Sequence, residues 1–265
     1  MLETIDWSRP WLAPLRHRAA SLLTAPDWRA ACNDAAAQAD LRNHRGLPLT
    51  FVAQSELPPN VAYETHISNS GQVPTRANLH DFFNALMWLA QPLSKARLNA
   101  IQAAEIVAHC PHTTAGSALS VRGKVRDRAT IFDENAAVLL SADPSIEAAL
   151  RAHRWPDVFV RRRDAFGQRC ELHLFGHALL EKLVTPYKAI TAHVWILPVA
   201  VDHFILLSPA QRHAAIDAQL AAALAAGLLQ QPSTPLPVLG VPHWWPQQDA
   251  AFYADTTVFR PRRET

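Results

Sequence analysis

The sequence predicts a single mixed domain, of the α/β or α+β class, in which helices flank a small sheet. Segments with apolar residues at helical spacing alternate with short apolar runs of strand length. No internal repeat or linker-like stretch divides the 265 residues, and hydrophobic residues make up 49% of them, enough for a sizeable core. We therefore expect one domain over residues 1–265.

Three parts follow one another within this domain. Residues 1–48 are expected to be helical, with two short helices in residues 9–40, the second opening at Asp27. Residues 49–231 form the expected core, which begins with a strand over residues 49–52. Prolines recur through residues 232–265, so this Pro- and Trp-rich part is expected to wrap the surface in extended form.

The first half of the core is predicted to hold two extended segments followed by two helices. Residues 63–67 and 72–75 have strand-like composition on either side of a polar turn. Asn78 can cap a helix that begins at Leu79 and stops at Pro92. A further helix is expected from Ser94 to a point before Pro111.

The second half of the core is predicted to be richer in strands. Residues 126–140 fit two strands joined by a turn over Asp133, Glu134 and Asn135, and Gly176 marks the start of a helix at His177. Ser208 followed by proline predicts a capped helix that runs to Gly227. The other predicted elements are strands at 158–160, 171–175, 190–197 and 204–207 and a helix at 145–153.

Charge, cysteine content and hydropathy restrict the partners and the compartment. The net charge of +2 gives no field that would favour nucleic acid or an anionic membrane. Cys32, Cys110 and Cys170 have no CxxC spacing, which argues against a disulfide framework and a cysteine zinc site. There is no secretory signal pattern, and no apolar run approaches the roughly 20 residues that span a bilayer. We expect a cytoplasmic protein without a membrane partner.

The first candidate site lies at the helix start near Asn78. His80 and Asn84 are one turn apart and share a helical face, which is how two metal or substrate ligands are commonly presented. Asp81 lies in the first turn, where the helix dipole favours a carboxylate. Capping of the helix start explains Asp81 and His80 equally well, so both interpretations stay open.

The second candidate site follows Gly176. His177 and Glu181 again have the i, i+4 spacing, which supplies half of a metal site but also suits a hydrogen-bonded pair between neighbouring helices. His193 interrupts an apolar strand and projects to the face opposite the apolar residues. It is either a catalytic histidine or one satisfied by a structural partner.

The third candidate site is the acidic pair Asp133–Glu134. Such a pair suits metal binding or acid/base chemistry, although the same residues are ordinary in a turn. Arg126 and Arg128 just upstream favour an anion-binding cleft. Lys188 can bind a phosphate or carboxylate, and a surface position is the alternative.

Five blocks follow one another along the chain: VPTRANLHDFFNALMWL, LNAIQAAEI, RDRATIFDEN, LFGHALLEKLVTPYKAITAH and LPVLGVPHWWPQQDAAFYADTTVFRP. Together they resemble a bacterial family known as domain-of-unknown-function family 3025. The resemblance extends from about Tyr63 to Pro261, implies a shared fold and a bacterial source, and supplies no activity. One departure is Ala136, where a glycine is expected to close the acidic turn.

The leading functional hypothesis is a metal-assisted hydrolase with a divalent metal ion in one cleft and a small-molecule or phosphorylated substrate. One alternative is a nuclease of the strand–strand–helix metal-finger kind over residues 63–89, with His66 as base. Another is a non-catalytic binding or assembly protein with an aromatic C-terminal docking surface. The predicted catalytic residues are His80, Asp81, His177, Glu181 and His193; the substrate-binding residues are Asn84, Arg126, Arg128 and Lys188; and the metal ligands are His80, Asp133, His177 and Glu181.

Overall fold

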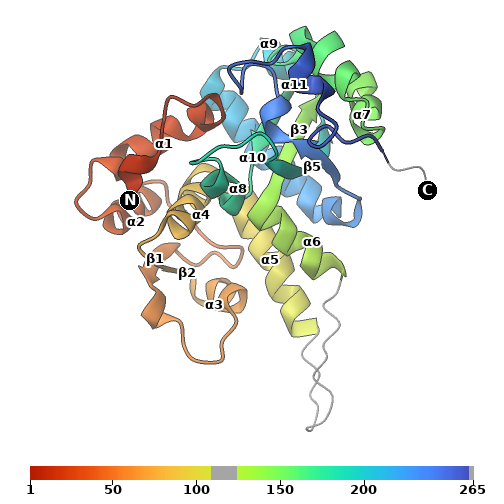
Figure 1. Cartoon of the computed structure of the whole chain (residues 1–265). Helices are drawn as coiled ribbons and strands as arrows, with labels where there is room; N and C mark the ends of the chain where they lie inside the picture. The colour runs from red at the N-terminus through yellow and green to blue at the C-terminus, as the bar shows by residue number, and fades with distance from the viewer. Residues whose placement is uncertain (109–123, 263–265) are drawn as a thin grey trace.

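The structure is a computed structural model that describes residues 1–108 and 124–262. It confirms a mixed α+β protein in which helices flank two small sheets. One sheet has two strands, β1 and β2, and the other has four strands in the order β4-β3-β5-β6. Figure 1 shows α4, α8 and α5 between the N-terminal part of the chain and the larger sheet.

The N-terminal part contains the two predicted short helices and the smaller sheet. These are α1 (Ala13–Leu23) and α2 (Trp28–Gln38), and Asp27 caps α2 by accepting from two backbone amides. β1 (Thr50–Ala53) pairs in parallel with β2 (Gln72–Thr75).

The predicted strand at residues 63–67 is wrong, because these residues belong to helix α3 (Tyr63–Ser70). The helix ends at Gly71, whose φ of 75° is left-handed and whose amide donates to the Ile67 carbonyl. His66 and Ile67 lie on its buried side. Packing against α5 therefore outweighs the strand propensity of this segment.

Two long helices follow β2 much as predicted. Asn78 accepts a hydrogen bond from the Asp81 amide at 2.7 Å and caps α4 (Leu79–Ala90), which is buried along most of its length. α5 (Pro92–Ala108) is capped by Asp217, a residue of α10 (Pro209–Ala225) that accepts from the first amides of α5. Ser208 caps α10, as its sequence predicts.

The predicted pair of strands over residues 126–140 is half wrong. Residues Lys124–Asn135 form helix α6, and only Ala136–Ser141 form a strand, β3. Ala129, Phe132 and Asp133 face inward at helical spacing, whereas Ile131 is 36% exposed. Ala136 thus begins β3 and closes no turn, so it needs no glycine.

The larger sheet is mixed in direction. β3 pairs in parallel with β5 (Thr191–Pro198) and antiparallel with β4 (Cys170–Leu174), and β6 (Thr234–Pro237) pairs antiparallel with β5. Helix α7 (Pro144–Arg151) follows β3.

Two of the strands predicted around this sheet are helical instead. The segment 158–160 lies in a helical turn, Asp157–Arg161, in which Asp157 pairs with Arg154 and Arg161 at i−3 and i+4. The segment 204–207 overlaps α9 (Asp202–Ile205), whose Ile205 is 68% exposed, so no apolar alternation exists there.

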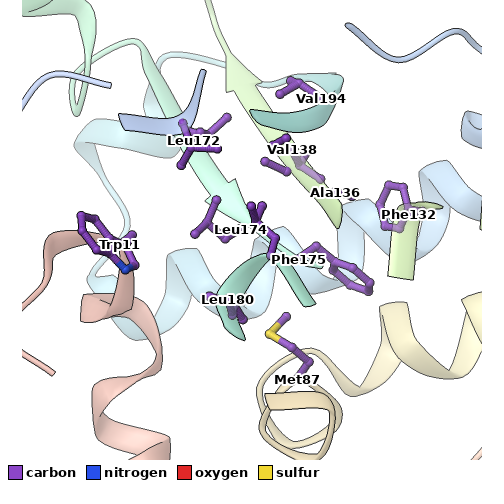
Figure 2. Close-up of a cluster of buried hydrophobic side chains, with 14 of the residues drawn as sticks. Trp11, Met87, Phe132, Ala136, Val138, Leu172, Leu174, Phe175, Leu180 and Val194 are labelled. Carbon is purple, nitrogen blue, oxygen red and sulfur yellow. The ribbon is translucent and has the colours of Figure 1, made fainter. Parts of the chain in front are cut away.

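The core is one contiguous cluster of buried side chains that extends from Ile5 to Phe259. Figure 2 shows buried side chains of the sheet, Leu172 and Leu174 of β4 and Val138 of β3, together with Leu180 of α8 (His177–Lys182) and Met87 of α4. α8 packs against α4 and α6, and this packing positions both histidines of the site described below.

The C-terminal part packs on the rest of the chain. Phe252 and Tyr253 of α11 (Ala250–Ala254) are buried together with Phe259. These rings are therefore not the exposed aromatic surface that the docking hypothesis requires. Cys32 and Cys170 are free and buried, and Cys110 lies outside the described residues. In the described part of the chain, no helix is both long and apolar enough to cross a membrane.

Candidate metal centre

A close backbone contact brings the end of α6 against the start of α8. The Ala136 carbonyl accepts from the Phe175 amide at 3.0 Å and from the Gly176 amide at 2.9 Å. A Cβ atom on Gly176 would lie 2.5 Å from both the Glu134 carbonyl oxygen and the Asn135 amide nitrogen. Only glycine leaves room for these backbone atoms to approach so closely, and the close approach places His177 beside Glu134.

His80, from α4, joins these two residues because α4 packs against α8. The Nε2 atoms of His80 and His177 are 3.0 Å apart. Glu134 Oε2 is 3.5 Å from His177 Nε2 and 4.0 Å from His80 Nε2. Among the described residues, these three form the one group of histidine, cysteine and acidic side chains whose donor atoms converge closely enough to hold a metal ion.

A carboxylate lies behind each imidazole. Glu181 Oε2 is 3.1 Å from His80 Nδ1, and Asp133 Oδ1 is 3.8 Å from His177 Nδ1. At 3.1 Å the Glu181 carboxylate can accept from His80 Nδ1 and orient that ring, as carboxylates orient metal-binding histidines. At 3.8 Å Asp133 is beyond hydrogen-bond distance, and His177 Nδ1 has no hydrogen-bond partner among the described residues. The i, i+4 pair of α8 therefore acts on the same partner: His177 contacts one nitrogen of His80 and Glu181 contacts the other.

A buried polar network supports Asp133. Lys95 Nζ lies 2.5 Å from Asp133 Oδ1 and donates to Asn84 Oδ1 at 2.8 Å, and Asn84 Nδ2 donates to the Tyr63 hydroxyl at 2.9 Å. Lys95 is 4% exposed, so its charge requires these partners. The network connects α3, α4, α5 and α6 behind the histidines.

Burial and neighbouring charges set the protonation of these groups. Burial lowers the pKa of His177 to about 4, against the opposing effect of Asp133. Burial also opposes ionisation of Asp133, but the charge and hydrogen bond of Lys95, together with the neighbouring histidines, outweigh it and leave the pKa of Asp133 below its usual value. At neutral pH His177 is therefore the neutral imidazole that metal ions bind. Burial and the Asp133 charge raise the pKa of Glu134.

A cavity of about 130 Å³ adjoins Glu134 on the side of α3 and α5. Asn99 Nδ2 donates to Glu64 Oε2 at 2.6 Å and fixes that side chain in the cavity wall. The residues that line the cavity are Glu64, Gln102, Ile106, Arg126, Thr130, Asp133 and Glu134.

The structure brings together several residues that the sequence singles out. His80 and His177 face each other. Glu181 lies behind His80 within hydrogen-bond distance and Asp133 lies behind His177 at 3.8 Å, so neither is next to the converging donor atoms. Asn84 reaches the centre through Lys95.

Other predicted site residues have different partners. The structure assigns Asp81 to the capping alternative, because its carboxylate accepts from the Arg76 amide at 2.6 Å. His193 Nδ1 lies 3.2 Å from Ser233 Oγ, which is the structural alternative for this histidine. Arg128 donates to the carbonyls of Leu229 and Gln230, far along the chain from the acidic pair.

Lys188 and His66 also lie apart from the converging donor atoms. Lys188 pairs with Asp255 at 2.7 Å and lies over the Phe252 ring, so it anchors the C-terminal part. His66 is buried on α3, and the helix–strand–helix order of α3, β2 and α4 lacks the two strands that a strand–strand–helix metal finger requires.

The sequence does not single out Lys95, Glu64, Asn99 and Tyr63. Of the acidic pair it names Asp133 as a candidate ligand, whereas the oxygen that converges with the two histidines belongs to Glu134. Lys95 in an amphipathic helix has the pattern of a surface residue, and nothing in the sequence gives its burial. Glu64 and Tyr63 were concealed by the incorrect strand assignment of their segment. For Glu134 the sequence contains a signal, because the acidic pair Asp133–Glu134 is itself a candidate site.

Comparison with known proteins gives a family and no activity. No curated protein and no solved structure matches the chain. A family model with the description "Protein of unknown function (DUF3025)" matches residues 49–263, which is most of the chain, and the protein therefore belongs to this family.

Proposed function

We propose that the protein is a metal-assisted hydrolase in which His80, Glu134 and His177 hold one divalent metal ion. The observation that carries this proposal is the convergence of three donor atoms at separations of 3.0, 3.5 and 4.0 Å. Tetrahedral zinc with ligands at about 2.0–2.1 Å has donor atoms about 3.3 Å apart. Three protein ligands and one open position are typical of a catalytic zinc site.

The tautomers of the two histidines support a cation between them. If each Nδ1 carries its proton toward the carboxylate behind it, both Nε2 lone pairs point at each other across 3.0 Å. If His177 instead donates from Nε2 to His80, its Nδ1 lone pair faces the Asp133 carboxylate at 3.8 Å. With two neutral imidazoles both arrangements oppose like partial charges, whereas a metal ion accepts both lone pairs. The arrangement without a metal is a His80 protonated on both nitrogens, which donates to Glu181 and to His177 Nε2.

A metal ion in this position would supply the chemistry of hydrolysis. It lowers the pKa of bound water and polarises a carbonyl or phosphoryl oxygen of the substrate. The adjoining cavity of about 130 Å³ admits a small group, and Arg126 in its wall provides a positive charge for a carboxylate or a phosphate. A small-molecule or phosphorylated substrate is consistent with this wall.

Elemental analysis of the purified protein tests the proposal. We expect about one transition-metal ion per chain, which is lost in His177→Ala and Glu134→Gln and kept in the control His193→Ala. Added zinc should raise the thermal stability of metal-free protein, since a ligand at 100 times its Kd stabilises by about 2.7 kcal/mol. The metal-loaded protein is then assayed with carboxylic esters, amides and phosphoesters.

Wild-type protein without stoichiometric metal, and without stabilisation by zinc, cobalt or manganese, would remove the proposal. The two histidines and Glu134 would then be a hydrogen-bonded group that joins α4, α6 and α8.

A further inference from the structure

Glu64 lines the same cavity as Glu134 but comes from a different helix. Glu64 belongs to α3, and Glu134 lies at the end of α6. Glu134 is the member of the three-residue centre that lines this cavity, so Glu64 faces the Glu134 side of the centre. The three-ligand arrangement supplies no proton acceptor, because Glu134 is one of the ligands.

Asn99 holds the Glu64 carboxylate through one oxygen. Its Nδ2 donates to Glu64 Oε2 at 2.6 Å and to the Glu64 backbone carbonyl at 2.9 Å. The second oxygen, Oε1, has no hydrogen bond to another residue in the parts of the chain described, 1–108 and 124–262. One oxygen is thus fixed by the fold and the other is available to a water molecule.

The surroundings tune Glu64 for proton transfer. Burial, followed by the Asp133 charge, raises the pKa of Glu64 to about 7, while Lys95 and Asn99 act in the opposite direction. A divalent cation nearby would favour the ionised carboxylate and lower this pKa. With the cation bound, Glu64 is then the ionised carboxylate at neutral pH, which is the form that accepts a proton.

We propose that Glu64 is the general base of the metal centre and accepts a proton from the water molecule at the open coordination position. The hydroxide so formed attacks the carbonyl or phosphoryl atom, whose bond to the leaving group breaks. The Glu64 carboxyl then returns the proton to that leaving group, so the net reaction consumes one water molecule. This inference rests on the proposed function, because it requires the metal.

Cobalt substitution tests Glu64 without knowledge of the substrate. The visible spectrum of Co²⁺ reports deprotonation of its bound water and is recorded from pH 5.5 to 9 in the wild type and in Glu64→Gln. We expect two coupled apparent pKa values in the wild type and one in Glu64→Gln, because Gln cannot ionise. The exposed Glu56→Gln, which keeps its helix-capping acceptor, is the matched control and should titrate like the wild type.

Each result decides the question. Identical pH titrations of wild type and Glu64→Gln, with cobalt affinities within about threefold, would overturn the role of Glu64 and leave the metal centre intact. A loss of cobalt affinity beyond tenfold in Glu64→Gln would show a metal ligand instead of a base. Wild-type protein that binds no cobalt would remove the metal centre itself. Should Glu64→Gln not fold, Glu64→Ala replaces it, because alanine cannot ionise either, and an unchanged titration of this variant would likewise overturn the proposal.

Discussion

Replacement of Gly176 by alanine should disrupt the metal centre without altering any ligand. The added Cβ would lie 2.5 Å from the Glu134 carbonyl oxygen and from the Asn135 amide nitrogen, and 2.6 Å from the Ala136 amide nitrogen. All three atoms belong to the backbone, so no side-chain rotation can relieve the contact. The start of α8 must move away from the end of α6.

The size of that movement follows from the contact distance. Ordinary van der Waals contact of a Cβ begins at 3.4 Å, so full relief from 2.5 Å takes a displacement of about 0.9 Å. Metal–ligand distances tolerate only about 0.2 Å. We therefore expect Gly176→Ala to weaken zinc binding at least about tenfold. Overpacking of this kind also costs about 1–3 kcal/mol of stability.

Zinc titration and thermal unfolding of metal-free protein measure the two effects separately. For a chain of this size, each kcal/mol lowers Tm by about 2–4 °C. The control is Gly46→Ala, since Gly46 has a φ of 79° but nothing within 4 Å of an added Cβ. This control should lose about 1 kcal/mol through backbone strain and keep its zinc affinity. Zinc affinity of Gly176→Ala within threefold of the wild type would refute the reasoning.

Three further predictions concern the same centre. Glu181→Gln removes an orienting carboxylate and should weaken zinc binding about 10–100-fold by titration, and an unchanged Kd would contradict that role. Because burial lowers the pKa of His173 to about 3 and of His177 to about 4, the unfolded chain binds more protons between those values and 6.5. In urea unfolding of metal-free protein, the free energy of unfolding should therefore fall as the pH drops below about 6.5. It should fall less steeply with pH in His177→Gln, and an equal slope in this variant would count against burial of His177 as a neutral group. Arg126→Gln should weaken inorganic phosphate binding to the zinc-loaded protein about tenfold by calorimetry while Lys188→Gln does not, and equal losses would remove Arg126 from the substrate wall.

Local signals in the sequence were sufficient for helices that carry their own caps. Asn78, Ser208 and the Gly176–His177 junction each mark a helix start that the structure reproduces. Elements without such signals depended on tertiary packing. α6 contains the run Ala129–Phe132, whose composition favours a strand, yet α6 packs as a helix against α5 and α8. The secondary-structure propensity of the twelve residues of α6 carries no information about its packing partners, α5 and α8.

The candidate site was predictable to the extent that it lies on single helices. The i, i+4 spacing predicts that His80 lies beside Asn84 and that His177 lies beside Glu181, because the two members of each pair share one face of their helix. α4 and α8 come into contact because α8 lies between the larger sheet and α4 in the folded chain (Figure 1). No local sequence pattern predicts that position. The same limit applies to Lys95, whose burial arises from Asp133 and Asn84 on other helices.

The assignment of Asp133 rather than Glu134 as a metal ligand follows from the misassigned element type. In a turn between strands, neighbouring side chains have no fixed relation to one imidazole ring. On a helix, successive side chains are about 100° apart, so two adjacent carboxylates can reach two sides of the same group. At the end of α6, Asp133 faces His177 Nδ1 at 3.8 Å and Glu134 faces His177 Nε2 at 3.5 Å. In the proposed metal centre Glu134 is therefore the ligand that joins His177, and Asp133 places its charge near the other nitrogen of the ring. The helical phase of α6 decides which residue takes which position.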